Sequence, residues 1–147
     1  MLNYRELNVN PKKRKTGDCS TRALVSCIGI DYNTALDLQV QEAKKSYYDI
    51  TSRQVMEKVL EKFGYYKMKQ PRKLDNTKYM VKEMDRVVSK SDLQNGVIVN
   101  VAHHYVTLRD SNYIDIWDSG HKCAGNYYIK IKWKEKKNDK SCFKIYC

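Results

Sequence analysis

Proline and glycine are scarce in this chain of 147 residues, which contains two prolines and six glycines spread along its length. This composition argues against long disordered segments and against collagen-like repeats. No apolar run approaches 18 residues, which excludes a membrane-spanning helix. The first residues, Met1 to Glu6, lack the hydrophobic stretch of a secretion signal. We therefore expect a cytoplasmic protein that has no membrane partner.

Acidic residues are few: the chain has 17 Asp and Glu but 28 Lys and Arg, which gives a net charge of +11 and a pI near 9.4. Such a charge favours acidic partners, namely nucleic acid, an acidic protein or an anionic surface. A general bias toward lysine gives the same composition without any such partner, and this is the interpretation that we favour. The sequence has neither an RNP-like motif nor a glycine-rich phosphate loop, so nucleic acid is not the preferred partner.

Cysteine is present in an odd number, and no two cysteines have the CxxC spacing of metal or redox motifs. The five cysteines are Cys19, Cys27, Cys123, Cys142 and Cys147. Without a secretion signal we expect reduced thiols, one of which is a candidate nucleophile. A second cluster contains His103, His104, Asp118, His121 and Cys123. Its spacing matches no common zinc pattern, so we expect no metal and no other cofactor.

The pattern of apolar residues changes from helical to strand-like along the chain. We expect a polar, basic lead-in over residues 1–16 and one domain over 17–147, with a helical part at 17–90 and a sheet part at 96–147. The expected helices span residues 19–28, 33–45, 52–63 and, less clearly, 76–88. The expected strands span residues 65–69, 97–101, 105–109, 113–117, 127–133 and 143–146. Helices followed by antiparallel strands indicate an α+β fold.

A turn signal at residues 110–112 predicts a hairpin between two strands. If the turn is centred on Ser111, the opposed pairs are Leu108 with Ile114, Val106 with Ile116, and His104 with Asp118. In this register Asp118 orients His104 and stabilises its protonated form, whereas His103 projects to the opposite face. A one-residue slip would reverse the assignment. Taken alone, the His–Asp pair is better interpreted as a structural contact at the end of a sheet.

Cys19 lies at the start of the first expected helix, where free backbone amides and the helix dipole favour a thiolate. A free cysteine near a helix cap is more often a small buried hydrophobe. The combination of a helix-start cysteine with a later His–Asp hairpin favours a nucleophile, in the chain order Cys19, His104, Asp118. Cys27 lies two turns further along the same helix and is expected to pack in the core.

Three segments together resemble a known family. They read Gly17-Asp18-Cys19-Ser20-Thr21-Arg22-Ala23-Leu24, His104-Tyr105-Val106-Thr107-Leu108 and Asp115-Ile116-Trp117-Asp118. This pattern resembles the small papain-like cysteine peptidases common in phages and prophages, and its layout is similar to that of the bacteriocin-leader peptidases. The resemblance covers about residues 16–120. It implies a papain-like fold, a catalytic triad of Cys19, His104 and Asp118, and, for a phage protein, a location in the host cytoplasm.

One feature of papain-like peptidases is absent, because no glutamine precedes Cys19 to serve as the oxyanion donor. Position 13, where such a glutamine could stand, is Lys13. The remaining candidates are the Cys19 backbone amide and the side chains of Asn8 and Asn10. Because losing one oxyanion donor costs about 10²- to 10³-fold in rate, this departure bears directly on proteolytic competence.

Two functions follow from these expectations. The first is a cysteine hydrolase that cleaves a peptide, isopeptide or related amide bond in a protein or peptide substrate, passing the acyl group to water or to another nucleophile. The alternative is a catalytically inactive papain-like protein. It would neutralise a host protein, as phage anti-defence factors do, or bind an acidic partner through its basic surface.

Overall fold

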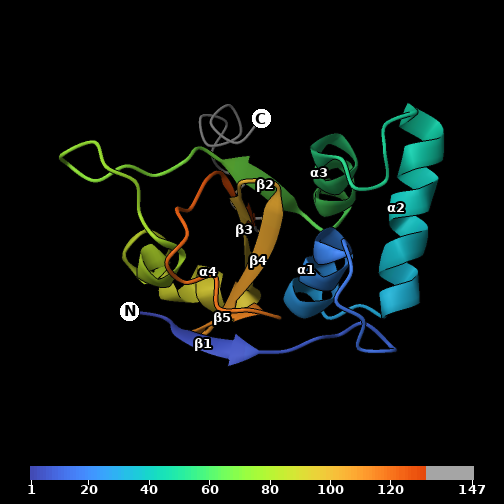
Figure 1. The fold of residues 1–147 in the computed structure, drawn as a ribbon. Helices are drawn as coiled ribbons and strands as arrows, with labels where there is room; N and C mark the ends of the chain where they lie inside the picture. The colour runs from blue at the N-terminus through green and yellow to red at the C-terminus, as the bar shows by residue number, and fades with distance from the viewer. Residues whose placement is uncertain (132–147) are drawn as a thin grey trace.

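The computed structural model describes residues 1–131. A six-stranded sheet forms the centre of this part of the chain (Figure 1). Its strands are β1 (Asn3–Glu6), β2 (Tyr65–Met68), β3 (Val97–Val101), β4 (His104–Arg109), β5 (Asn112–Asp115) and β6 (Tyr127–Lys130). The helices are α1 (Cys19–Ile28), α2 (Tyr32–Ser46), α3 (Arg53–Lys62), the 3₁₀ helix η1 (Val81–Arg86) and α4 (Lys90–Asn95). The fold is thus of the predicted α+β class.

The strands are arranged in the order β1-β5-β4-β3-β6-β2. All neighbouring strands are antiparallel except β1 and β5, which are parallel. The helices α1, α2 and α3 lie on one side of the sheet, and α4 lies on the other (Figure 1). The expected strand at 143–146 and the end of the one at 127–133 lie outside the described residues.

Two clusters of buried side chains hold these layers together. One lies between the sheet and the helices α1 and α3, and includes Leu24, Cys27, Met56, Leu60 and Ile98. The other lies on the opposite face and includes Met84, Leu93, Val97, Val106 and Leu108. Because side chains alternate along a strand, β3 and β4 contribute to both clusters and form the centre of the fold.

Local signals account for the first three helices, which the sequence predicted. Gly29 ends α1 in the left-handed region at φ 82°, where glycine has no steric penalty. The Asp31 carboxylate accepts a hydrogen bond from the Asn33 amide at the start of α2. The Ser52 hydroxyl accepts one from the Val55 amide at 3.2 Å and caps α3.

Two parts of the chain differ from the expectation. Residues 3–6, within the expected lead-in, form β1, whose polar side chains gave no strand pattern because it is an edge strand held by backbone pairing with β5. The helix expected at 76–88 is wrong: only η1 forms there, followed by the unpredicted α4. The backbone of Tyr79 instead accepts a bond from Ala124, and the Val81 amide donates to Lys122. These tertiary contacts override a weak helical pattern.

No helix within residues 1–131 is both long enough and apolar enough to cross a lipid bilayer.

Candidate active site

The hairpin of β4 and β5 has a different register from the predicted one. Its turn contains two residues, Asp110 and Ser111, and Asp110 adopts φ 53°. The observed pairs are Arg109 with Asn112, Leu108 with Tyr113, and Thr107 with Ile114. The chain thus slips by one residue relative to a turn centred on Ser111. Because side chains alternate with period two, the slip moves Asp118 away from the face of His104 and brings Asp115 onto it.

Asp115, and not Asp118, is the acidic partner of His104. Its Oδ2 lies 2.6 Å from the ring Nε2 of His104, and its side chain is only 3% exposed. The Ser119 hydroxyl donates to the same oxygen at 2.8 Å, while the Ile116 amide donates to Oδ1 at 2.8 Å. These bonds fix the carboxylate in place. The orienting role predicted for Asp118 is therefore corrected to Asp115.

Asp118 instead stabilises the loop that follows β5. Its carboxylate accepts a hydrogen bond from the Tyr113 hydroxyl at 2.5 Å and from the Gly120 amide at 3.1 Å. A Cβ atom at Gly120 would collide with the same hydroxyl, so a larger residue here would displace the Tyr113 ring. Asp118 is thus a structural residue of the turn, beside the site but without contact to the imidazole.

The Cys19 sulfur at the start of α1 lies beside the His104 ring and the Tyr105 backbone, close enough for both to lower the pKa of its thiol. Because Asp115 binds Nε2, the nitrogen left for the sulfur is Nδ1. Helix α1 packs across β4, which brings the first residue of the helix to the first residue of the strand. The structure thus brings Cys19, His104 and Asp115 together as the Cys19–His104–Asp115 chain, in which a hydrogen bond joins the last two residues.

These contacts shift the ionisation of both groups. Burial raises the pKa of the Cys19 thiol, but the hydrogen bonds from His104 and the Tyr105 backbone, with the charges of His104 and Arg22, outweigh it and lower the pKa. Burial lowers the pKa of His104, but the bonds and charges of Asp115 and Cys19 raise it to about 9. Both shifts favour a thiolate–imidazolium pair.

Trp117 packs on the imidazole, a contact that the predicted register did not contain. Its ring centre lies 5.0 Å from that of His104, and the ring planes are inclined by 32°. Continuing the observed register places Trp117 opposite His104 and Asp115 on its diagonal, and both positions are within side-chain reach. A two-residue turn at Asp110 and Ser111 is the sequence signal that would have found both residues.

Asp18 and Arg22 anchor the start of α1. The Asp18 carboxylate makes no capping bond; it accepts from Arg22 and from the Tyr32 hydroxyl at 2.7 Å. The Arg22 guanidinium also donates to the carbonyl of Thr16 at 3.1 Å. The side chains of Asp18 and Arg22 are only 12% and 8% exposed. This buried ion pair explains why Asp and Arg flank the cysteine in the sequence.

The two asparagines proposed as oxyanion donors are engaged elsewhere. The Asn8 amide donates to the Arg14 carbonyl at 3.0 Å, and the Asn10 amide donates to Asp18 at 2.9 Å. The Cys19 amide precedes the first hydrogen bond of α1, which joins the Arg22 amide to the Asp18 carbonyl. Among the three predicted donors, only the Cys19 backbone amide is free to serve an oxyanion.

A cleft of about 740 Å³ opens beside the Cys19 sulfur. Its walls come from the starts of α1 and α3, from the β3–β4 turn and from the loop before β6. The lining residues are Gly17, Cys19, Thr51, Ser52, Arg53, Gln54, Gln70, Asn100, Ala102, His103, Tyr105, Gly125 and Asn126. His103 thus lines the cleft without taking the place of His104. Within residues 1–131, no three His, Cys, Asp or Glu side chains gather as metal ligands would.

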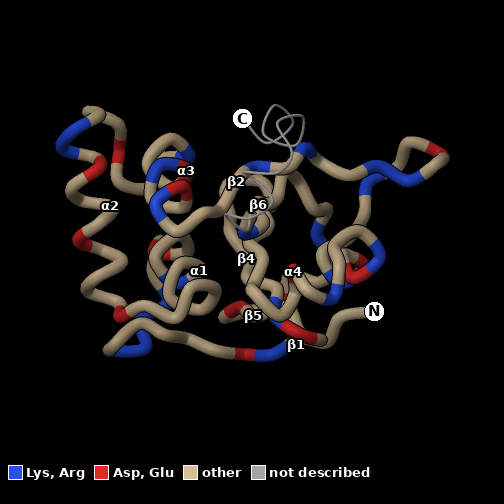
Figure 2. Tube along the Cα trace, turned by 180° about the vertical axis from the view of Figure 1, so that it is seen from behind, with Lys and Arg blue, Asp and Glu red and all other residues tan. Residues whose placement is uncertain are grey.

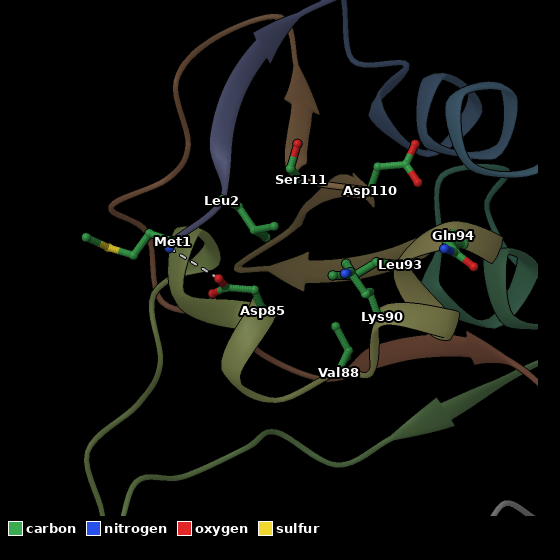
Figure 3. Close-up of a pocket in the computed structure, with 9 residues that line it drawn as sticks. All are labelled: Met1, Leu2, Asp85, Val88, Lys90, Leu93, Gln94, Asp110 and Ser111. Carbon is green, nitrogen blue, oxygen red and sulfur yellow. Dashed lines mark ion pairs between the residues drawn. The ribbon is translucent and has the colours of Figure 1, made fainter.

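Another cavity, of about 400 Å³, lies on the other side of the sheet (Figure 3). It is lined by Met1, Leu2, Asp85, Val88, Lys90, Leu93, Gln94, Asp110 and Ser111. The amino group of Met1 forms an ion pair with Asp85 at 3.2 Å. This cavity contains none of the residues of the Cys19–His104–Asp115 chain, so the cleft is the candidate active site.

The comparisons with known proteins give no match: no protein-family model, curated protein or solved structure is significantly similar to this chain.

Proposed function

We propose that this chain is a papain-like cysteine hydrolase that cleaves a peptide, isopeptide or related amide bond. The observation that supports this best is the placement of the Cys19 sulfur beside His104, whose imidazole is hydrogen-bonded to the Asp115 carboxylate at 2.6 Å. The three groups are a nucleophile, an acid–base and an orienting acid, as cysteine hydrolysis requires. An open cleft beside the sulfur provides room for a substrate.

The chemistry has two halves. The Cys19 thiolate attacks the carbonyl carbon, and the Cys19 amide donates to the oxyanion that forms. The C–N bond then breaks as the His104 imidazolium gives its proton to the leaving nitrogen, which leaves a thioester on the sulfur. Neutral His104 next takes a proton from water, and the resulting hydroxide equivalent attacks the thioester. The acid product departs and the thiolate–imidazolium pair is restored.

The proposal is tested by thiol reactivity. Iodoacetamide is added at pH 7, and the alkylation of each cysteine is followed by mass spectrometry of peptides. We expect Cys19 to react at least tenfold faster than Cys123, which is exposed and lies outside the Cys19–His104–Asp115 chain. We expect His104→Ala to remove this advantage. If Cys19 reacts no faster than Cys123 in the wild type, the hydrolase is contradicted and the non-catalytic binding protein becomes the better account.

A further inference from the structure

The cleft beside Cys19 has an unusual balance of charge among its lining residues. None of the 13 residues that line it is Asp or Glu, whereas Arg53 is cationic and four residues are amides. Lys, Arg, Asp and Glu are interspersed along the described trace (Figure 2). Basic charge alone therefore does not distinguish the cleft; the complete absence of acid from its walls does.

Arg53 is the permanent charge of the cleft. It is the first residue of α3 and is exposed, and among residues 1–131 it has no ion pair or hydrogen-bonded acid. The acid one turn further along the helix, Glu57, would be its usual partner. Glu57 is occupied instead, since it accepts a bond from the Tyr128 hydroxyl at 2.7 Å and pairs with Lys67 at 3.7 Å. The guanidinium is thus left for a ligand.

Arg53 also lies near Tyr105, a neighbour of the Cys19 sulfur. Burial and the charges of Glu57 and Cys19 raise the pKa of Tyr105 to about 12, and the charge of Arg53 opposes this rise. Tyr105 is the residue whose backbone binds the Cys19 sulfur. Arg53 and Cys19 therefore flank the same tyrosine and line the same cleft.

We infer that the substrate carries an acidic side chain, Asp or Glu, at one of the two residues on the acyl side of the scissile bond, and that Arg53 binds its carboxylate. The planar guanidinium fork suits a carboxylate in a two-point contact, which a lysine would not provide. The neighbouring amide of Gln54 and the Nδ2 of Asn126, whose Oδ1 accepts from the Gln70 amide, are suited to the peptide backbone. The inference rests on the proposed function, because it assigns the specificity of the same site.

The test uses dipeptidyl chloromethyl ketones, in which the Cys19 sulfur displaces chloride from the methylene carbon. Two pairs are compared, with Glu or Gln at the residue that carries the reactive group, and with Glu or Gln at the preceding residue. Each labelling rate is divided by the iodoacetamide rate of the same protein, which corrects for intrinsic thiol reactivity. The test variant is Arg53→Gln. The control is Lys90→Gln, which removes the same charge from a residue at the cavity of Figure 3.

In the wild type and in Lys90→Gln we expect at least one Glu reagent to react about threefold to tenfold faster than its Gln counterpart, as a charge interaction across a wet cleft allows. In Arg53→Gln the ratio should fall to near one. The inference is overturned if Cys19 is rapidly alkylated by iodoacetamide but neither pair shows a Glu preference, or if Arg53→Gln keeps that preference. Slow alkylation by iodoacetamide would instead overturn the proposed function itself.

Discussion

The two ends of α1 each carry a cysteine, and the two thiols are chemically opposite. Cys19 at its start is partly exposed and touches His104 and the Tyr105 backbone, and its pKa is lowered. Cys27 in the last turn is fully buried in the core beneath the Tyr65 hydroxyl. Burial raises the pKa of Cys27 to about 11, although its bond to Tyr65 and the charge of Arg109 oppose this.

This difference shows which contact controls a thiol in this fold. Each cysteine has an arginine nearby: Arg22 of α1 is near Cys19, and Arg109 of β4 is near Cys27. A neighbouring cation alone therefore does not decide whether the pKa of the thiol falls or rises. What Cys19 has in addition is an imidazole that is itself held by a buried carboxylate. The ionisation of the Cys19 thiol therefore depends on His104 of β4 and Asp115 of β5. The start of α1 alone does not provide these contacts.

The largest expected effect comes from removing the sulfur at one end of α1 or the other. Cys19→Ala should abolish hydrolysis and chloromethyl ketone labelling, because no other described thiol touches His104. Cys27→Ala should leave the labelling rate within about threefold of the wild type. Mass spectrometry of the labelled protein measures both. Equal loss of labelling in the two variants would show that the ends of the helix do not differ as described.

The next effect separates the two aspartates after β4. Asp115→Asn should lower the labelling or hydrolysis rate by roughly 10²- to 10⁴-fold, because the amide no longer stabilises the imidazolium or fixes the ring. Asp118→Asn should change the rate by less than about threefold, since its carboxylate serves Tyr113 and Gly120.

The measurement is the rate of both variants with one reagent at pH 7, and circular dichroism checks that each is folded. If Asp118→Asn proved the more damaging, the register of the hairpin drawn from the structure would be wrong.

A smaller effect concerns pH. The imidazolium of His104 donates the proton to the leaving group, and its pKa of about 9 means that this form persists below that pH and is lost as the pH rises through it. The thiolate appears as the pH rises through the lowered pKa of Cys19. Hydrolysis by Cys19 should therefore follow a bell-shaped profile with its alkaline limb near pH 9. An alkaline limb near 6.5, the ordinary pKa of histidine, would contradict the coupling to Asp115.

The smallest effect is on stability. Cys27→Ala should lower the free energy of unfolding by about 1–2 kcal/mol, because it leaves space in the core and removes the contact with the Tyr65 hydroxyl. Urea denaturation measures this change, with Cys123→Ala as a control at an exposed cysteine. The control should lose less than about 0.5 kcal/mol. Equal losses would mean that Cys27 is not the core residue that the packing indicates.

The sequence predicts much of this arrangement where the signals are local. Gly29 marks the end of α1 and Ser52 marks the start of α3, and the apolar residues at helical spacing after Cys19 place it at a helix start. The predicted register selects His104, and although that register is wrong by one residue, the structure still places His104 beside Cys19. The helix ends depend only on residues within one or two turns, so the local sequence is enough to predict them.

Asp115 was missed because its position depends on a single residue of turn length. The same sequence is compatible with a turn centred on Ser111 and with a two-residue turn at Asp110 and Ser111. The first turn places Asp118 on the face of His104, whereas the second places Asp115 there. The strand β1 was missed for a related reason: its pairing with β5 spans about a hundred residues of sequence and leaves no periodic pattern in its polar side chains. Long-range pairing and register are set by tertiary contacts.

The most direct test of the account is the ionisation of Cys19 itself. The thiolate absorbs near 240 nm, so the difference in absorbance between the wild type and Cys19→Ala, followed against pH, reports this one sulfur. We predict that its thiolate forms well below pH 9.0, the ordinary value for the thiol, and that His104→Ala moves the transition upward. A transition at 9.0 or above in the wild type, unchanged by His104→Ala, would contradict the coupled Cys19–His104–Asp115 chain.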